Sequence, residues 1–213
     1  LIEHLQAQVR RGSLNESALR AHYVNPQEAI QTIALEITPT TVQLLRDLED
    51  RQVRELDDQF EKDLQEREKK YLEPPLDQQI RKRADRMQER VEQWLGKASA
   101  AQRQRIQEWA RALSEQNQLW LDNRAQWQRS LVEAVRNREQ ANFDERIARL
   151  LQDREVYWTA PYRAAFPAVE QATIDLVIDL YDMADATQRR HLDERLQDMR
   201  RDLSSLDCLP ASR

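Results

Sequence analysis

The side chains that most often bind metals or form covalent bonds are few and dispersed in this sequence. The three histidines, His4, His22 and His191, have no cysteine or glutamate at a ligand spacing on a shared helix face. Cys208 is the only cysteine, so no disulfide can form within the chain. We therefore expect no metal site and no bound cofactor.

The same holds for residues that catalyse reactions without a metal. No serine–histidine–aspartate or cysteine–histidine arrangement is evident, and the only two glycines, Gly12 and Gly96, are too far apart for a glycine-rich phosphate loop. Neighbouring carboxylates such as Asp57 and Asp58 lie on highly charged segments, which seldom build the pocket that catalysis needs. The sequence thus predicts no catalytic residue, and we expect the chain not to be an enzyme.

Tryptophans are the residues that most clearly suggest a binding surface. Of the five in the chain, four lie in one stretch: Trp94, Trp109, Trp120 and Trp127. Large or apolar residues also recur there at a spacing of seven: Ile106, Leu113, Trp120, Trp127 and Ala134. The companion positions Gln116, Asn123 and Ser130 are polar, which excludes a plain two-stranded coiled coil.

Two interpretations of this tryptophan row remain open. The indoles either pack a long helix against its neighbours, or stay partly exposed and line a groove for an apolar or peptide partner, since tryptophan is enriched at binding hot spots. Arg124 and Arg129 flank Trp127, so a guanidinium can stack on its ring.

Glutamine recurs at expected helix starts. Ser99 precedes Gln102, and Asp185 precedes Gln188, at the spacing of a capping box, in which the first side chain accepts a backbone N–H and the glutamine returns to the first residue. A weaker third copy, from Leu48 to Gln52, falls inside an expected helix. These repeats are either ordinary caps or a family signature.

Composition sets the fold class. The 213 residues include two glycines and seven prolines, and 33% are charged, which favours helices joined by few loops. The net charge of −5, with both signs interleaved, argues against nucleic acid as a partner. The sequence contains no apolar run of about 18 residues, the length that a membrane-spanning helix needs. We predict an all-α, elongated helical bundle, with residues 1–213 as a single domain.

Helix breakers and apolar periodicity place the elements. Two long helices are expected at about 39–72 and 100–138, with a corner at Pro74-Pro75 between them. Shorter helices are expected to end at Gly12 and to begin at Asn25-Pro26, and the first long helix is expected to begin at Thr38-Pro39.

The C-terminal part is expected to be helical as well. Residues 159–167, with two prolines, are expected to be irregular. The apolar helix 168–184 is expected to run through the middle of the bundle, and the last helix to begin after Asp185 and to end near Leu206.

A basic cluster lies on the helix that follows the corner: Arg81, Lys82, Arg83, Arg86 and Arg90. It is either a solvated face neutralised by acidic residues before the corner, or a patch for an anionic partner.

The glutamine-bearing helix starts resemble the LTxxQ motif of small periplasmic stress chaperones of the Spy and CpxP type, although the Leu-Thr pair is absent. More of the chain resembles an uncharacterised family of bacterial envelope lipoproteins, a domain of unknown function. The matching positions span about 40 to 206: Leu44, Leu45, Leu48, Gln52, Lys82, Arg83, Trp94, Leu95, Gly96, Gln102, Trp120, Leu121, Arg124, Trp127, Gln128, Gln188 and Arg189. The resemblance implies a periplasmic domain, held to a membrane of a Gram-negative bacterium by a lipid anchor outside this sequence.

These observations predict a non-catalytic envelope protein that binds a protein partner or an unfolded client in a groove with an apolar floor and charged rims. The candidate binding or signature residues are Trp94, Gly96, Gln102, Trp109, Trp120, Arg124, Trp127 and Gln188. The alternative is a structural spacer or homodimer of the cell envelope, in which the narrow apolar stripe of residues 42–64 is the self-association face.

Overall fold

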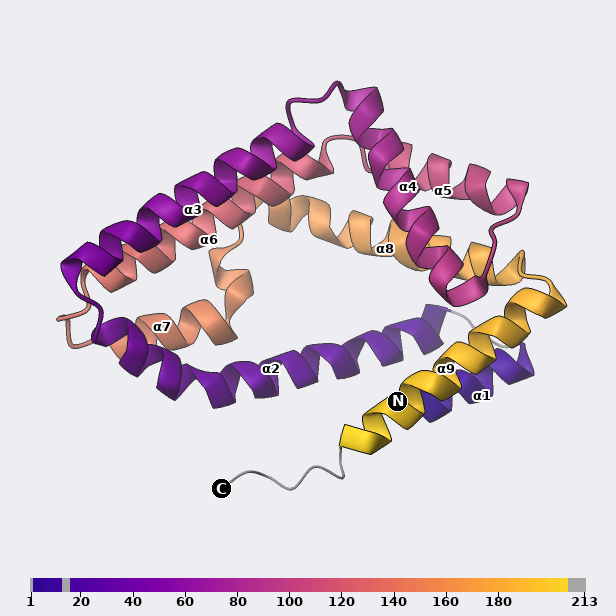
Figure 1. The fold of residues 1–213 in the computed structure, drawn as a ribbon, viewed down its shortest axis with the longest axis horizontal. Helices are drawn as coiled ribbons and strands as arrows, with labels where there is room; N and C mark the ends of the chain where they lie inside the picture. The colour runs from indigo at the N-terminus through magenta and orange to yellow at the C-terminus, as the bar shows by residue number, and fades with distance from the viewer. Residues whose placement is uncertain (1, 13–15, 207–213) are drawn as a thin grey trace. The chain divides into compact units, whose positions relative to one another are not determined.

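The structure is a computed structural model that describes residues 2–12 and 16–206, apart from the side chains of residues 2, 4, 18, 21–29, 203, 205 and 206. Cys208 and the side chains of His4 and His22 lie outside this description. The described residues are mostly helical and contain no strand, which confirms the predicted all-α class (Figure 1). In chain order the helices are α1 (Ile2–Arg11), α2 (Glu16–Arg46), α3 (Asp50–Tyr71), α4 (Leu76–Leu95), α5 (Ala100–Ala112), α6 (Gln116–Arg136), α7 (Phe143–Gln152), the 3-10 helix η1 (Arg154–Tyr157), α8 (Ala160–Asp182) and α9 (Ala186–Leu206).

The chain forms two compact units, each made from several segments. Unit 1 contains residues 1–25, 80–112 and 170–213, and unit 2 contains residues 26–79 and 113–169. The single-domain interpretation remains a prediction.

Several predicted helix ends are confirmed. Gly12 and Gly96 follow α1 and α4 with φ of 66° and 74°, the left-handed conformation that glycine adopts without strain. Pro74-Pro75 separates α3 from α4, and α9 begins directly after Asp185. These ends depend on local backbone chemistry, which is why the sequence predicts them.

The predicted helix 39–72 is wrong in its bounds. Helix α2 runs through Pro26 and Pro39, where new helices were expected, and stops at Arg46. The Thr38 hydroxyl donates to the Ala34 carbonyl at 2.5 Å, and Gln152 of α7 donates to the Thr38 hydroxyl at 3.0 Å. These bonds hold the helix across Pro39, which itself lacks a backbone N–H.

The break comes instead at the third glutamine motif. Glu49 is extended, with φ −73° and ψ 155°, and its N–H donates to Gln52 Oε1 at 2.8 Å. The motif therefore caps the start of α3 rather than lying inside a helix. A capping box can start a helix without glycine or proline.

The predicted helix 100–138 is also two helices. Between α5 and α6, Ser114 adopts φ 38°, an unfavourable value for a residue with a side chain. Just beyond, the Asn117 amide donates to the Tyr71 carbonyl and to Gln79 Oε1, both at 3.0 Å. Asn117 thus fixes the start of α6 to the corner after α3, a long-range constraint with no local signal.

Residues 160–167 are helical rather than irregular. Helix α8 begins at Ala160, so Pro161 stands in the first turn, where its missing N–H costs nothing, and the helix continues through Pro167. Its buried side chains are Leu176, Leu180 and Tyr181, while Val177 is 41% exposed. The apolar helix 168–184 was expected to run through the middle of the bundle, whereas α8 buries one face and exposes another.

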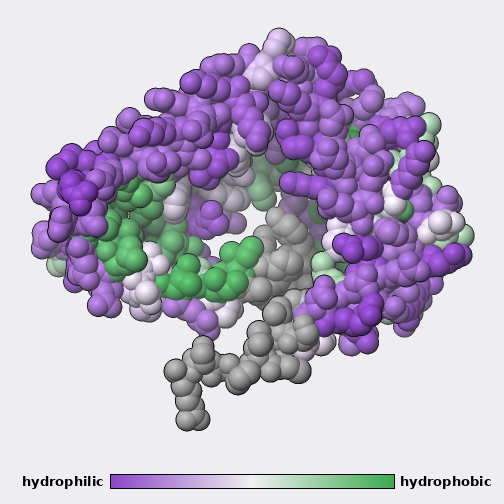
Figure 2. Space-filling view, in the orientation of Figure 1, coloured by the Kyte–Doolittle hydropathy of each residue, from purple (hydrophilic) through white to green (hydrophobic). Residues whose placement is uncertain are grey.

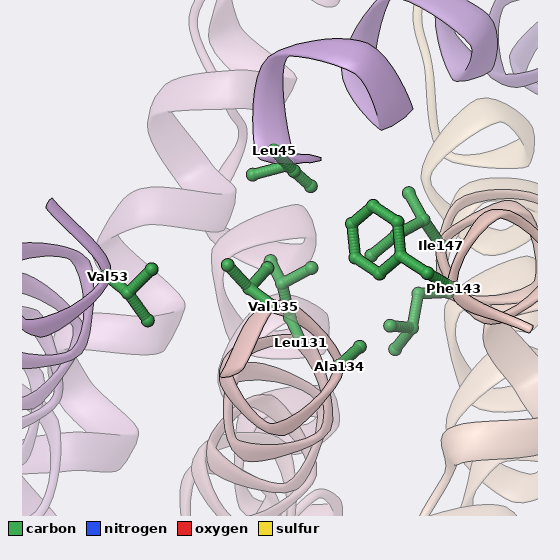
Figure 3. Close-up of a cluster of buried hydrophobic side chains, with 8 residues drawn as sticks. Leu45, Val53, Leu131, Ala134, Val135, Phe143 and Ile147 are labelled. Atoms are coloured by element: carbon green, nitrogen blue, oxygen red, sulfur yellow. The ribbon is translucent and has the colours of Figure 1, made fainter. Parts of the chain in front are cut away.

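Unit 2 is built around a compact apolar core. Helix α3 lies along α6, and α7 packs against α6 (Figure 1). Their buried side chains meet those of α2 in one cluster (Figure 3): Leu45, Val53, Leu131, Ala134, Val135, Phe143, Ile147 and Leu150. The predicted apolar stripe of residues 42–64 belongs to this packing: Val53 is buried, and Val42, Leu48 and Phe60 pack against the cluster.

Unit 1 has a smaller apolar cluster. Helix α1 lies along α9 (Figure 1), and the buried side chains Val9, Tyr181 and Leu196 form its centre. The Tyr181 hydroxyl donates to the Val9 carbonyl at 2.9 Å, which ties α8 to the end of α1.

Candidate functional site: an aromatic cavity in unit 2

The structure divides the eight candidate residues between the two units. Five are in unit 1: Trp94, Gly96, Gln102, Trp109 and Gln188. Trp120, Arg124 and Trp127 are in unit 2 and line one cavity.

In unit 1 the two predicted capping boxes both form. Ser99 N–H donates to Gln102 Oε1 at 2.9 Å, and Gln102 N–H donates to Ser99 Oγ at 3.2 Å. At the start of α9, Asp185 N–H donates to Gln188 Oε1 at 3.3 Å, and Gln188 N–H donates to Asp185 Oδ1 at 2.8 Å. Both glutamines act as N3 residues, as their spacing predicts.

The two glutamines also bind each other. Gln102 Nε2 donates to Gln188 Oε1 at 3.1 Å, and Gln188 Nε2 donates to Gln102 Oε1 at 3.0 Å. The second amide protons go to the Leu180 and Lys97 carbonyls, at 3.1 and 2.9 Å. Both side chains are buried, at 0% and 7% exposure. This reciprocal pair, called the glutamine pair below, has no spare hydrogen-bonding capacity for a ligand.

The other unit 1 candidates also have structural positions. A Cβ on Gly96 would lie 3.9 Å from the His191 ring, an ordinary contact, so the positive φ is what requires glycine there. Trp94 is half-buried and packs on the Val9–Tyr181–Leu196 cluster. Trp109 is 7% exposed, and its indole N–H has no partner within the described residues. None of them lines the cavity of unit 2.

That cavity has a volume of about 350 Å³ and an aromatic wall. Its lining residues come from α6, η1 and the start of α8: Trp120, Asn123, Arg124, Trp127, Arg154, Glu155, Tyr157, Trp158 and Tyr162. The four from α6 follow a helical i, i+3, i+4, i+7 spacing, so they share one face. Two of the four tryptophans that suggested a groove, Trp120 and Trp127, therefore line one wall of a cavity.

The opposite wall is fixed to α6 by Asn123. Its Oδ1 accepts the Thr159 N–H at 2.9 Å, immediately before α8, and Thr159 Oγ1 accepts the Tyr162 N–H at 3.4 Å. Arg163 Nη2 then donates to the Glu155 carbonyl at 2.8 Å, which closes η1 onto α8. These bonds place Trp158 and Tyr162 opposite the α6 indoles.

The aromatic rings of this wall hold one another in place. Trp158 meets Tyr162 edge to face at 5.2 Å between ring centroids, and Phe166 at 4.7 Å. On the α6 side, the Trp127 indole N–H donates to the Leu150 carbonyl at 2.9 Å, and Trp120 meets Tyr71 edge to face at 5.7 Å. Such pairs fix ring orientation at small cost, so the cavity is preformed.

The carboxylate of Asp63, on α3, positions the arginine that α6 contributes to the cavity. Asp63 Oδ2 accepts from Arg124 Nη2 at 2.9 Å, and Arg67 Nε donates to Asp63 Oδ1 at 2.9 Å. The hydrogen bond from Arg67, with that from Arg124, lowers the pKa of Asp63 to about 2, so the carboxylate stays charged. The Arg67 guanidinium also lies 5.7 Å from the Trp120 ring centroid. Asp63 therefore holds two arginines, and through them an indole, in position.

Part of the cavity lining keeps unused binding capacity. The Arg154 and Glu155 side chains are exposed and make no hydrogen bond or ion pair with the described residues, and the Asn123 Nδ2 amide makes none either. Indole and phenol faces offer apolar area and accept cations, and these polar groups can orient a bound segment. The arrangement suits recognition of one or two side chains of a partner.

Three of the nine residues that line the cavity were predicted from the sequence: Trp120, Arg124 and Trp127. Tyr162 lies in the stretch 159–167 that the sequence predicts to be irregular, and Trp158 directly precedes it. Asp63 carries no sequence signal, and Asn123 stands out only as a polar position beside the tryptophan row. The one sign of this wall in the sequence is the group of aromatic residues around the two prolines of that stretch.

Part of the basic cluster that follows the Pro74-Pro75 corner serves packing, because Arg83 is buried and donates to the Ala110 carbonyl at 2.8 Å. Burial lowers the pKa of Arg83.

A family model matches residues 1–163, about three quarters of the chain. The chain belongs to the family of unknown function DUF6279. The DUF6279 match contains all nine residues that line the aromatic cavity, together with Gln102. The comparison with curated proteins found no match, and neither did the comparison with solved structures.

The part of this DUF6279 member that the structure describes contains neither a membrane-spanning helix nor a metal-binding cluster. No helix in the described ranges is long and apolar enough to cross a bilayer. Across residues 2–12 and 16–206, no three or more His, Cys, Asp or Glu side chains gather as a metal site would require.

Proposed function

We propose that this chain is a non-catalytic protein-binding domain of the bacterial periplasm, and that its aromatic cavity holds a segment of a protein partner or unfolded client. The observation that carries the proposal is the preformed wall of three indoles and two phenols beside the exposed Arg154 and Glu155. The location and the lipid anchor rest on the resemblance of residues 40–206 to envelope lipoproteins.

Cavity size supports a peptide side chain as the occupant. About 350 Å³ lies at the lower end of the range for ligand pockets, which suits one or two large side chains. Tryptophan, tyrosine and arginine are the residue types that contribute most to protein–protein binding energy. The single lining carboxylate, Glu155, is exposed, so nothing in the lining favours acid–base catalysis.

The test uses fluorescence anisotropy to measure how tightly a chemically unfolded, fluorescently labelled protein binds to this chain. We expect saturable binding that Arg154→Ala weakens about tenfold, since arginine at a hot spot contributes more than 1 kcal/mol. Trp158→Ala is expected to weaken it further. Arg149→Ala, another exposed arginine of unit 2 with no described partner, is the matched control and should bind as the parent does.

Two results would overturn the proposal. One is the absence of saturable binding by the parent chain. The other is an equal loss in Arg154→Ala and Arg149→Ala, which would show that only net charge matters. Circular dichroism of each variant separates loss of binding from loss of fold.

A second candidate is self-association through α2. Four large apolar residues share one face of this helix and are 47–59% exposed: Ile30, Ile33, Ile37 and Leu44. Figure 2 shows hydrophobic residues gathered along this part of the surface. Monomers rarely expose such a stripe, which favours a partner or a second copy there.

Sedimentation equilibrium distinguishes the two candidates. A dimer that Ile33→Ser converts to monomer would support self-association. A monomer at all concentrations would remove this candidate and leave the cavity proposal standing.

A further inference from the structure

Unit 1 contains a second cavity, and its lining is mostly arginine. Its volume is about 390 Å³, and it lies between the end of α1 and the first turns of α9. The lining residues are Val9, Arg10, Arg11, Gly12, Arg189, Arg190 and Asp193. The lining thus contains four arginines and one carboxylate.

That carboxylate is fully engaged by α1. Asp193 Oδ1 accepts from Arg10 Nε and from Gln6 Nε2, both at 2.8 Å, and its Oδ2 accepts from Arg10 Nη2 at 3.1 Å. The hydrogen bond from Arg10 lowers the pKa of Asp193, so the pair stays ionised. Arg10 is therefore neutralised, and the charge of the remaining three arginines is not.

One of these three is held in place. Arg189 is half-buried, its Nε donates to the Ala184 carbonyl at 3.1 Å, and its guanidinium lies 4.9 Å from the Tyr181 ring centroid. Its Nη1 reaches the backbone at Gly12, where a Cβ would lie 3.8 Å from it. A guanidinium oriented in this way loses little side-chain entropy when it binds a ligand.

The other two have no described function in the fold. The side chains of Arg11 and Arg190 are exposed, and neither side chain makes a hydrogen bond or ion pair with the described residues. Cations at the end of α1 suit its helix dipole, but Arg189 and Arg190 stand near the start of α9, where the dipole disfavours them. The first turn of α9 itself has no acidic residue, but the N-cap Asp185, whose Oδ1 accepts the Gln188 N–H, supplies a negative charge at this helix start.

We propose that this cavity binds a phosphate-type anion. Guanidinium groups present paired N–H donors that match phosphate oxygens. The anion would neutralise the positive charge of Arg11, Arg189 and Arg190, which no ion pair with the described residues offsets. This site shares no residue with the aromatic cavity, and its test is independent of the proposed function.

Phosphate can come from free phosphate or from a lipid headgroup, and two assays distinguish them. Calorimetry with inorganic phosphate at constant ionic strength measures the first. Co-sedimentation of the full chain with phosphatidylcholine vesicles, with and without phosphatidic acid, measures the second. Saturable phosphate binding assigns a free anion, and binding only to phosphatidic acid vesicles assigns a headgroup; both support the site.

The variants are Arg11→Gln and Arg190→Gln, with Arg195→Gln as control. Each arginine removed from the cavity should weaken binding about tenfold, the loss of one charge-assisted hydrogen bond. Arg195 is exposed on the same helix and does not line the cavity, so the same charge change there should have little effect. No saturable binding in either assay, or an equal loss in Arg190→Gln and Arg195→Gln, would overturn the proposal.

Discussion

The glutamine pair of unit 1 and the aromatic cavity of unit 2 are built from residues that looked equally functional in the sequence. The side-chain amides of Gln102 and Gln188 make all their hydrogen bonds to each other and to backbone groups. Around the cavity, the side chains of Arg154 and Glu155 make no hydrogen bond with the described residues. A residue whose bonding capacity is used inside the fold stabilises it, whereas one with spare capacity beside a cavity is available to a ligand.

The largest effect on stability is expected from Gln102→Ala. The change leaves the buried amide of Gln188 and the Leu180 carbonyl without their partner, which should cost about 3 kcal/mol of unfolding free energy. Urea denaturation measures the loss. A loss below about 1 kcal/mol would show that water or rearrangement replaces the pair, and that the pair is not what holds these helix starts together.

A smaller loss of stability is expected from Asp63→Asn. The amide keeps the shape but removes the charge that binds Arg67 and Arg124, at a cost of about 1 to 2 kcal/mol for a partly exposed site. Because Arg124 lines the cavity, client affinity should fall as well. If stability and affinity both match the parent chain, Asp63 does not position this wall.

Asp63 also predicts a pH dependence. Its pKa in the folded chain is about 2, below its ordinary value of 3.8, so its contribution to stability is present above about pH 4 and is lost as pH falls towards 2. Unfolding free energy measured across this window should therefore fall more steeply in the parent chain than in Asp63→Asn. Parallel curves would contradict the assignment.

The smallest effect is expected from Gln52→Ala. Gln52 caps α3 as Gln102 caps α5, but it is exposed and its side chain accepts a single described hydrogen bond, from Glu49 N–H. Its loss should cost about 0.5 kcal/mol, typical of a solvent-exposed cap. A cost comparable with that of Gln102→Ala would mean that capping alone, and not the buried pairing, explains the glutamine motif.

Local chemistry made part of this fold predictable. The stops at Gly12 and Gly96, the corner at Pro74-Pro75 and the caps at Gln102 and Gln188 follow from backbone preferences that a few adjacent residues determine. The helix periodicity also identified the α6 face of the cavity.

Contacts between distant residues were not predictable. Where α2 continues through Pro39, Gln152 of α7 donates a hydrogen bond to the Thr38 hydroxyl. Helix α6 starts where the Asn117 amide donates to the Tyr71 carbonyl, at the corner after α3. In the same way, Asn123 places the start of α8, and with it Trp158, against α6. Each depends on side chains brought together by tertiary packing, on which helix propensity and spacing carry no information.

The central claim is that clients bind at the aromatic cavity of unit 2 and not at the tryptophans of unit 1. Site-specific photocrosslinking compares the two directly, with a photoreactive phenylalanine in place of Tyr157 or of Trp94. Both residues are half-buried aromatics packed beside a core cluster, so they are matched in setting. We predict that an unfolded client crosslinks at position 157 and not at 94. Crosslinking at 94 alone, or at both positions equally, would contradict the account.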